Sequence, residues 1–468
     1  MRQQEVDVVI LGGGSAGELA AALLAEAGQR VALVEVDRIG GACPFFACMP
    51  SKALLHSAAL RAAMIANGTR IGAAGSKWSP GDTGEAWRAA VNWRDQVTEG
   101  RDDSEHARLL EKAGVQLLRA WGTIQSEHSV AAGDTLLRCR HIIMATGSEA
   151  IIPPVDGLEE AEPWTSEAAL VSGHLPSSLI VLGAGAVGCE LSQVYARFGT
   201  EVCLVDKAPV PLSSEEPEAS GLVAEVLAQD GVSLRLGARA RSVAVGTDGY
   251  KLALHSGETL RAEKLLLASG RRPRTRGLGL ENLGVDPDGP LEVDDFGEVP
   301  GHRGLWAAGD ITGVAPFTHT AKYQARVVAS NVLGKRVRAD YRAIPRCVFT
   351  DPSVAAVGMT SAAAQEAGIR TVAATVALGS TARSSVEGST CGAVGLLADL
   401  ERAILIGAFL VGPSAEESIG QAAVGIQCRI PVRALSGVVA PFPAFAEAYD
   451  DALRQIVAQL PEPAAVPG

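Results

Sequence analysis

Short apolar runs, each closed by glycines or by an acid, recur along the chain and set the expected order of elements. Residues 6–11 (VDVVIL) are typical of a strand buried in a parallel sheet. An Ala/Leu-rich stretch to about residue 27 predicts a helix, and residues 31–34 predict a second strand that ends at Glu35. Strand, helix and strand together form a βαβ unit.

The same pattern occurs a second time. Residues 178–182 and 201–205 predict two strands, residues 189–198 predict the helix between them, and Asp206 closes the second strand. We therefore expect an α/β fold with two Rossmann-type domains. Three more apolar stretches each predict a short strand that ends in a turn of small residues: 141–147, 264–270 and 304–310.

Both βαβ units carry G-x-G-x-x-G between the first strand and the helix. The glycines allow a tight turn and a close approach of the backbone to a pyrophosphate, which the helix N-terminus faces. An acid at the end of the second strand can accept hydrogen bonds from a ribose diol. Two dinucleotide sites imply an electron donor and a tightly held acceptor, hence a nicotinamide nucleotide and a flavin. The residues are Gly12, Gly14, Gly17 and Glu35 in the first unit and Gly183, Gly185, Gly188 and Asp206 in the second.

The acid of the second unit bears on which nicotinamide nucleotide is bound. Asp206 suits a free 2′-hydroxyl and repels a 2′-phosphate, so we expect NADH, with NADPH as the alternative. Lys207 and Arg197 are cations nearby in the sequence and weaken this inference.

Composition narrows the class of protein. A chain of 468 residues exceeds what one core usually supports and predicts about three domains. With 47% hydrophobic residues the chain is globular, and its net charge of −12 argues against nucleic acid as a partner. No apolar run approaches the ~20 residues that span a bilayer, and the first five residues lack the apolar core of a signal peptide. We therefore expect a cytoplasmic protein.

Eight cysteines do not form a disulfide scaffold in that compartment. Most are expected to be small buried hydrophobes, but Cys43 and Cys48 lie five residues apart in GGACPFFACMPSK, just before a predicted helix. The helix dipole and its unpaired N–H groups stabilise a thiolate at Cys48, which makes a cysteine reactive. No second Cys or His pair stands at ligand spacing, so we expect no metal site.

In the form GG-x-C-x4-C-x-PSK this motif resembles that of the class I flavoprotein disulfide reductases, which include dihydrolipoamide dehydrogenase, glutathione reductase and mercuric reductase. The resemblance covers nearly the whole chain and implies two Rossmann-type dinucleotide-binding domains and an α+β dimerisation domain, in a homodimer. The implied division is an FAD domain of residues 1–152 and 271–345, an NAD(P) domain of residues 153–270 and an interface domain of residues 346–468.

The resemblance also implies roles for individual residues. Cys48 would contact the flavin as the charge-transfer thiolate, and Cys43 would be the interchange thiol that meets the substrate. Lys52 and Glu190 would pair beside flavin N5. His319 matches a histidine of dihydrolipoamide dehydrogenase near the pyrimidine edge of the flavin, and a structural histidine is the alternative.

Further residues complete the two expected cofactor sites. Asp310 would hold the ribityl chain of FAD. Gly41, Thr146 and Gly147 are expected on the FAD side, and Gly270 is expected on the NAD side.

One part of the family pattern is missing. The reductases carry H-x-H-P-x-x-x-E near the C-terminus, and its second His, held by the Glu, moves the proton between interchange thiol and substrate sulfur across the dimer interface. In the matching stretch Pro443 and Glu447 align, but Phe442 takes the place of that His, and no histidine follows His319. A benzyl side chain cannot transfer a proton.

Two substrate classes are compatible with this loss. One is a small disulfide whose leaving thiol is acidic or leaves as a thione, such as the mercaptoimidazole disulfide of ergothioneine, because a low leaving-thiol pKa speeds exchange. The other is a metal ion or a quinone. Mercuric reductases also lack the His, which makes that branch the nearest. They typically carry a C-terminal cysteine pair and an N-terminal metal-binding module, however, and no cysteine follows Cys428, so mercury is the less favoured substrate.

Phe45 and Phe46 separate the two cysteines, where the common form is C-x-N-V-G-C. With Phe442 and Phe445 they would line an aromatic cleft for a flat heteroaromatic substrate. Packing against each other or against the interface is the favoured alternative.

The leading function is FAD-dependent, NAD(P)H-driven reduction of a small disulfide through Cys43 and Cys48. One alternative is an NADH-driven metal-ion or quinone reductase that uses the same centre. The other is a redox-sensing or electron-transfer flavoprotein without a small disulfide substrate.

Overall fold

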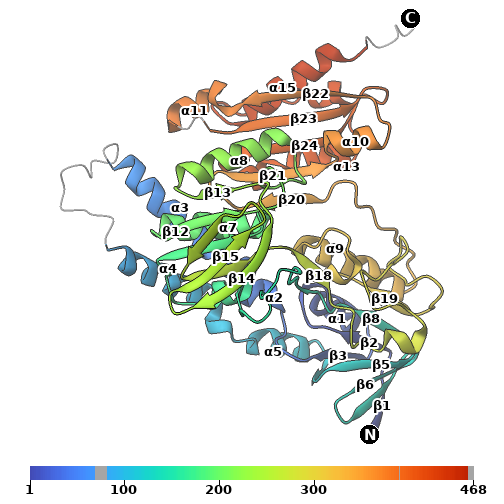
Figure 1. The fold of residues 1–468 in the computed structure, drawn as a ribbon. Coiled ribbons are helices and arrows are strands. Elements are labelled where there is room, and N and C mark those ends of the chain that lie inside the picture. The colour runs from blue at the N-terminus through green and yellow to red at the C-terminus, as the bar shows by residue number, and fades with distance from the viewer. Residues whose placement is uncertain (69–81, 389–390, 462–468) are drawn as a thin grey trace, which may run out of the picture.

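The computed structural model describes residues 1–68, 82–388 and 391–461. The fold has three large sheets, two of them parallel and the third, near the C-terminus, antiparallel, and helices lie against them (Figure 1). The third sheet, orange to red in Figure 1, lies at the end of the molecule opposite to the N-terminus. Among the described residues no helix has both the length and the apolar character needed to cross a bilayer.

The first large sheet carries the first glycine loop. Its central strand β2 (Val8–Leu11) is buried along its whole length, as expected for a strand covered on both faces. It is flanked by β3 (Val31–Glu35) and β8 (His141–Met144), and β4 (Gln116–Arg119) and β19 (Leu305–Ala307) form the edges. Because all five strands are parallel, the turns after β2, β8 and β19 meet at one edge of the sheet.

Helices cover one face of this sheet and a smaller sheet covers the other. α1 (Ser15–Glu26) and α9 (Thr318–Val332) pack on β2 through small side chains such as Ala20 and Ala325. The opposite face packs on strands near Ile124 and Val130. The remaining elements of this part are α5 (Ser104–Lys112), β1 (Arg2–Glu5), β5 (Gly122–Ser126), β6 (Ser129–Ala132), β7 (Thr135–Arg138) and the 3-10 helices Glu99–Arg101, Leu280–Leu283 and Asp310–Thr312.

The second large sheet repeats the parallel arrangement in the order β10-β17-β11-β12-β13. β11 (Ser178–Leu182) and β12 (Glu201–Val205) have the bounds predicted from the sequence. The neighbouring strands are β10 (Trp164–Thr165), β13 (Ser233–Arg235) and β17 (Lys264–Leu267). The other elements are α6 (Ser166–Val171), α7 (Ala186–Arg197), α8 (Pro217–Gln229) and a three-stranded antiparallel sheet of β14 (Ala240–Gly246), β15 (Gly249–Leu254) and β16 (Thr259–Ala262).

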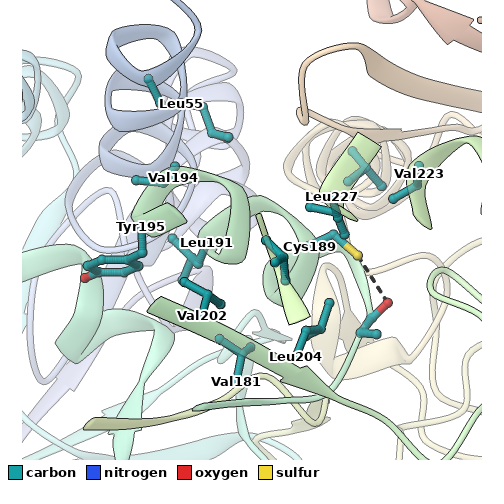
Figure 2. Packing of buried hydrophobic residues seen from close by; sticks show 14 of the residues in the cluster. Leu55, Val181, Cys189, Leu191, Val194, Tyr195, Val202, Leu204, Val223 and Leu227 are labelled. Atoms are coloured by element: carbon teal, nitrogen blue, oxygen red, sulfur yellow. Dashed lines mark hydrogen bonds between the residues drawn. The ribbon is translucent and has the colours of Figure 1, made fainter. Parts of the chain in front are cut away.

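Helix α7 is buried between this sheet and the helix that follows the cysteine motif. Figure 2 shows Leu191 and Val194 of α7 between the strands of the sheet and Leu55 of α3 (Cys48–Asn67), all in one apolar cluster. α3 also packs on α4 (Thr83–Val97). The helix that begins at Cys48 is therefore fixed to the helix of the second βαβ unit.

The last sheet is antiparallel, in the order β20-β21-β24-β23-β22. Two short chain segments lie where the chain passes between the first and the second large sheet. Those segments, β9 (Ser148–Ala150) and β18 (Arg271–Pro273), pair with each other. The predicted fold class, α/β with two dinucleotide-binding units and a C-terminal α+β part, is confirmed. The C-terminal elements are β20 (Pro345–Val348), β21 (Ser353–Gly358), β22 (Thr371–Ala377), β23 (Ala393–Asp399), β24 (Ile404–Gly412), α10 (Ser361–Glu366), the 3-10 helix Leu378–Ser380, α11 (Ala382–Glu387), α12 (Ala415–Ser418), α13 (Gly420–Gln427), α14 (Val432–Leu435) and α15 (Ala446–Gln459).

Candidate active site

The two cysteines of the motif lie on consecutive helices. Cys43 is in the short helix α2 (Ala42–Phe45), and Cys48 is the first residue of α3. Gly41 precedes α2 with a φ of +69°, and a Cβ there would lie 2.7 Å from the Cα of Gly14. The cysteine segment therefore packs directly on the first glycine loop, an approach that requires glycine.

Cys48 has the surroundings of a reactive thiolate. The thiol of Cys43 hydrogen-bonds to its sulfur, and this contact is the main reason why the pKa of Cys48 lies below its ordinary value. Thr318 Oγ1, 3.4 Å from Cys48 Sγ, and the charge of Lys52 lower that pKa further, against the effect of burial. The same hydrogen bond, together with burial, raises the pKa of Cys43. In the dithiol form the first negative charge therefore resides on Cys48.

Lys52 and Glu190 form an ion pair that joins α3 to α7. Lys52 Nζ lies 2.9 Å from Glu190 Oε2 and 3.1 Å from Oε1. Glu190 is buried and also accepts a hydrogen bond from the amide of Phe349 at 2.8 Å, while the centre of the Phe349 ring lies 4.4 Å from Lys52 Nζ. The pair expected from the sequence is thus brought together one helical turn after Cys48.

The first glycine loop has the shape of a pyrophosphate cradle. A Cβ at Gly12 would lie 2.4 Å from the carbonyl oxygen of Ala145, and one at Gly17 would lie 1.9 Å from that of Gly12, so both positions require glycine. At Gly14, where α1 begins, the nearest atom to a Cβ is 3.9 Å away. The loop is therefore closed against the sheet and open at the helix N-terminus, which fits the pyrophosphate of FAD.

The second glycine loop has the same construction. A Cβ at Gly183 would lie 2.3 Å from the carbonyl oxygen of Ala268, and one at Gly188 would lie 1.8 Å from that of Gly183. At Gly185, the N-cap of α7, a Cβ would meet nothing within 4 Å. This loop fits the pyrophosphate of a nicotinamide nucleotide in the same way.

Glu35 and Asp206 bind backbone amides in the same manner. Glu35 accepts hydrogen bonds from the amide of Gly13 in the glycine loop (2.6 Å) and from the amide two residues after itself (2.7 Å). Asp206 does so with the amide of Ala184 (2.6 Å) and with the amide two residues after itself (2.7 Å). The carboxylates thus fix the loops, and their remaining lone pairs can accept from a ribose hydroxyl.

The other expected cofactor residues lie in the turns after the parallel strands. Asp310, which follows β19, accepts a hydrogen bond from Ser148 Oγ at 2.6 Å. Thr146, after β8, donates its hydroxyl to a main-chain carbonyl of the returning chain at 2.6 Å. Gly147 (φ +74°) and Gly270 (φ +112°) take backbone conformations that favour glycine.

His319 is the second residue of α9. Its Nε2 lies 2.9 Å from the carbonyl oxygen of Pro345 and donates to it, and its ring stacks on Phe317 with centroids 5.2 Å apart. The hydrogen bond and the ring stack fix the orientation of the imidazole and leave Nδ1 for another partner.

The C-terminal segment places its residues in two different environments. Phe442 is 77% exposed, whereas Phe445 packs on the core of the last sheet. Glu447 accepts a hydrogen bond from the amide of Ala444 at 3.1 Å, at the start of α15. Within one chain Glu447 therefore stabilises the turn that presents Phe442.

The two phenylalanines of the cysteine motif contact each other. Phe45 is buried and lies edge-on to Phe46 and to His106, with centroids 6.2 and 5.6 Å apart. In the described part of one chain no ring contact joins them to Phe442 or Phe445. The aromatic cleft considered above is therefore not formed by these four residues within a single chain.

Three residues next to the cysteines and the ion pair were missed by sequence reasoning. Thr318 contacts Cys48 although 270 residues separate them, and the charge of Lys322 acts on Cys43. Both flank His319 on one helix, so helical periodicity around that histidine could have indicated them. No local pattern indicates the contact of Phe349 with the ion pair.

The other cysteines differ in exposure. Cys139 and Cys189 are buried, as expected for small hydrophobes, but Cys428 is exposed.

In the residues that the structure describes, no group of three or more His, Cys, Asp and Glu side chains could hold a metal ion.

Comparison with known proteins shows which family has this fold and this cysteine motif. Residues 6–325 match the family described as pyridine nucleotide-disulphide oxidoreductase, and residues 344–453 match the dimerisation domain of that family. A dihydrolipoyl dehydrogenase of Thermus scotoductus is 32% identical over 96% of this chain and 97% of its own length. A mercuric reductase of Acidithiobacillus ferrooxidans is also 32% identical, over 94% of this chain and 80% of its own length.

The fold is shared with a solved structure. The Cu(II) complex of the HOCl-induced flavoprotein disulfide reductase RclA from Escherichia coli matches with a TM-score of 0.83 and 26% identity, over 97% of this chain and all of that chain. The family binds FAD and a pyridine nucleotide, and bound FAD supplies the two-electron relay between that nucleotide and a cysteine pair. The chain therefore belongs to the pyridine nucleotide-disulphide oxidoreductase family, an enzyme family, with Cys43 and Cys48 as its redox pair.

Proposed function

We propose that the protein is a homodimeric, NADH-dependent reductase of a small disulfide whose leaving thiol is acidic or departs as a thione. Disulfides of mercaptoimidazoles, such as that of ergothioneine, belong to this class. The observation that carries the proposal is the replacement of the family's acid–base histidine by Phe442, in a chain with no histidine after His319.

The chemistry of exchange explains why this replacement selects the substrate. The Cys43 thiolate attacks one sulfur of the substrate, the substrate S–S bond breaks, and the departing sulfur takes the electron pair. Cys48 then attacks the Cys43 sulfur of the mixed disulfide, which releases the second half of the substrate and closes the Cys43–Cys48 disulfide. Each departing sulfur needs a proton unless it is stable as an anion or as a thione.

The surroundings of the thiols support this reading. Of the side chains that contact Cys48 or act on Cys43, none is an imidazole or a carboxylic acid within hydrogen-bond reach in the described residues. His319 donates its Nε2 proton to a backbone carbonyl instead. A substrate that needs little protonation is therefore the one that this centre suits.

The preference for NADH is supported by the ion pairs and the position of Arg197. Arg197, which weakened the sequence argument, is bound to Asp230 and Asp351, with its Nη1 2.7 Å from Asp351 Oδ2. It lies at the C-terminal end of α7, away from the glycine loop. Asp206 remains beside that loop, where its charge opposes a 2′-phosphate.

The proposed homodimer is supported by an apolar surface in the C-terminal part. Val439 is 94% exposed and Phe442 77% exposed in the single chain. With Val438, which is 65% exposed, they place three exposed apolar side chains within five residues of the sequence, and contiguous exposed apolar patches mark interaction sites. They lie in the part of the chain that matches the family's dimerisation domain.

The proposed domain division is the one given by the resemblance: residues 1–152 with 271–345, residues 153–270, and residues 346–468. It is supported by the membership of the strands, since β19 returns to the first sheet after the second sheet has been completed.

A metal-ion reductase is the second candidate, because a mercuric reductase is among the 32% identical relatives and a Cu(II) complex of a relative has been solved. The test is NADH oxidation by the FAD-loaded protein with a panel of disulfides, Hg²⁺, Cu²⁺ and quinones. The proposal expects turnover with acidic-thiol or thione disulfides. Turnover with a metal ion alone, or with none of the panel, would refute it.

A further inference from the structure

A lysine that the family pattern does not predict lies one helical turn after a residue that contacts the cysteine pair. Thr318, the first residue of α9, places its hydroxyl 3.4 Å from Cys48 Sγ, so the first turn of α9 contacts the pair. Lys322 follows four residues later and therefore lies on the same side of the helix. Its side chain is exposed and is not paired with a carboxylate in the described part of the chain.

Three charged side chains act on the two sulfur atoms, one from each helix around them. They are Lys52 on α3, Glu190 on α7 and Lys322 on α9. Lys52 and Glu190 are bound to each other at 2.9 Å, so their fields largely cancel at a distance. Lys322 is the charge without such a partner, and it favours the thiolate of Cys43.

We propose that Lys322 is a positioning residue that acts through Cys43, by stabilising the thiolate with which this residue attacks the disulfide. The inference rests on the proposed function, because it takes Cys43 as the attacking thiol. It gives the Cys43 thiolate a counter-charge from the same chain, but not a proton donor.

The chemistry of the side chain defines what it can and cannot do. Burial and the hydrogen bond to Cys48 hold the pKa of Cys43 above its ordinary value, and the cation and the hydroxyl of Thr318 oppose them. A lysine ammonium is too weak an acid to replace an imidazolium as proton donor near neutral pH. Lys322 therefore helps the attack of Cys43 but not the departure of the leaving sulfur, which keeps the preference for acidic leaving thiols.

The test measures the thiols directly and needs no turnover. The FAD-loaded protein is held reduced with excess phosphine and treated with iodoacetamide, a neutral reagent that Lys322 does not attract. Alkylation of Cys43 and of Cys48 is followed by peptide mass spectrometry between about pH 5 and 10, because the alkylation rate of a thiol below its pKa rises with pH in proportion to the thiolate fraction. The variants are Lys322→Met and Lys322→Arg. The matched control is Lys335→Met, an exposed lysine 13 residues further on, just beyond the C-terminal end of α9.

The expected result is confined to one cysteine and one charge. In Lys322→Met the alkylation profile of Cys43 moves up by about one pH unit, so that the rate near neutral pH falls about tenfold. Lys322→Arg and Lys335→Met retain the native profile. Raising the salt concentration to about 1 M reduces the difference between the native protein and Lys322→Met, because Lys322 is exposed and salt screens its charge from the Cys43 thiolate.

The outcomes separate this inference from the proposed function. An unchanged Cys43 profile in Lys322→Met overturns the inference whatever the substrate is. A loss in Lys322→Arg equal to that in Lys322→Met also overturns it, since the charge is then not what matters. If the shift is found but no acidic disulfide is reduced, the inference stands and the proposed substrate class fails.

Discussion

Lys52 and Glu190, 138 residues apart in the sequence, form a two-pronged ion pair with Nζ–O distances of 2.9 and 3.1 Å. The pair ties the helix that begins at Cys48 to the helix that follows the second glycine loop. The two dinucleotide-binding units are thereby connected at the redox centre and not only through the chain segments β9 and β18.

Glu190→Gln should therefore destabilise the protein, because it leaves the Lys52 ammonium without its counter-charge. Glu190 is 7% and Lys52 34% exposed, so we expect a loss of about 1–3 kcal/mol, below the range of fully buried pairs. The midpoint of thermal unfolding, followed by circular dichroism, measures it. Glu149→Gln is the control, since the exposed pair of Glu149 with Arg272 should contribute less than about 1 kcal/mol. Equal shifts in both variants would refute a special role for Lys52 and Glu190.

Thr318→Val should make the Cys48 thiolate harder to form. Because the pKa of Cys48 is lowered in the native protein, the anion persists as the pH falls and is lost only below the ordinary thiol range. Removing the Thr318 hydroxyl takes away one stabilising contact, so the anion should be lost at a higher pH. The long-wavelength absorbance of the two-electron-reduced protein reports the anion beside the flavin.

Thr318→Ser is the control for this prediction, because it keeps the hydroxyl. Cys48→Ser should abolish the absorbance at every pH. A band that survives in Cys48→Ser would show that the anion lies elsewhere.

NADH should bind more tightly than NADPH and reduce the bound flavin faster, because the charge of Asp206 opposes a 2′-phosphate. Stopped-flow measurement of flavin bleaching with each nucleotide gives the ratio. Asp206→Ser should narrow that ratio, whereas Asp230→Ser, which removes a partner of Arg197 at the far end of α7, should leave it unchanged. Faster reduction by NADPH in the native protein would contradict the assignment.

Val439→Asp should weaken the dimer, because it places a charge in the exposed apolar stretch that includes Phe442. Light scattering across a dilution series measures the effect. Val245→Asp is the control: Val245 is 56% exposed but lies on β14, outside the dimerisation domain. A native protein that is fully active as a monomer would rule out the shared active site.

Much of the fold followed from local patterns in the sequence. β11 and β12 have the predicted bounds because each is a short buried run between turn residues. The strand predicted at residues 6–11 begins two residues later, at Val8, because Asp7 pairs with Arg30 and Arg140 instead of continuing the apolar run. Helical and strand periodicity cannot anticipate an ion pair between distant segments.

The candidate site was predictable where a motif defines it and not where distant segments meet. The glycines, Cys43 and Cys48 could be identified because each stands at the spacing of a known sequence motif. Thr318 contacts Cys48 from 270 residues away, and Phe349 contacts Glu190 from 159 residues away, so only the fold reveals them. The hydrogen bonds of Glu35 and Asp206 to amides of the glycine loops were likewise not foreseen, because these amides lie 22 residues earlier in the chain.

The central claim is that the centre lacks a proton donor for the leaving thiol, and turnover against disulfides of graded thiol pKa tests it most directly. With NADH in excess, we predict that kcat/KM rises as the leaving thiol becomes more acidic. Lipoamide or glutathione disulfide should be slower by about 10²–10⁴-fold, the usual contribution of a positioned acid, with little change across the histidine range near pH ~6.5. A rate ordinary for these enzymes with such a high-pKa alkyl disulfide would contradict the account.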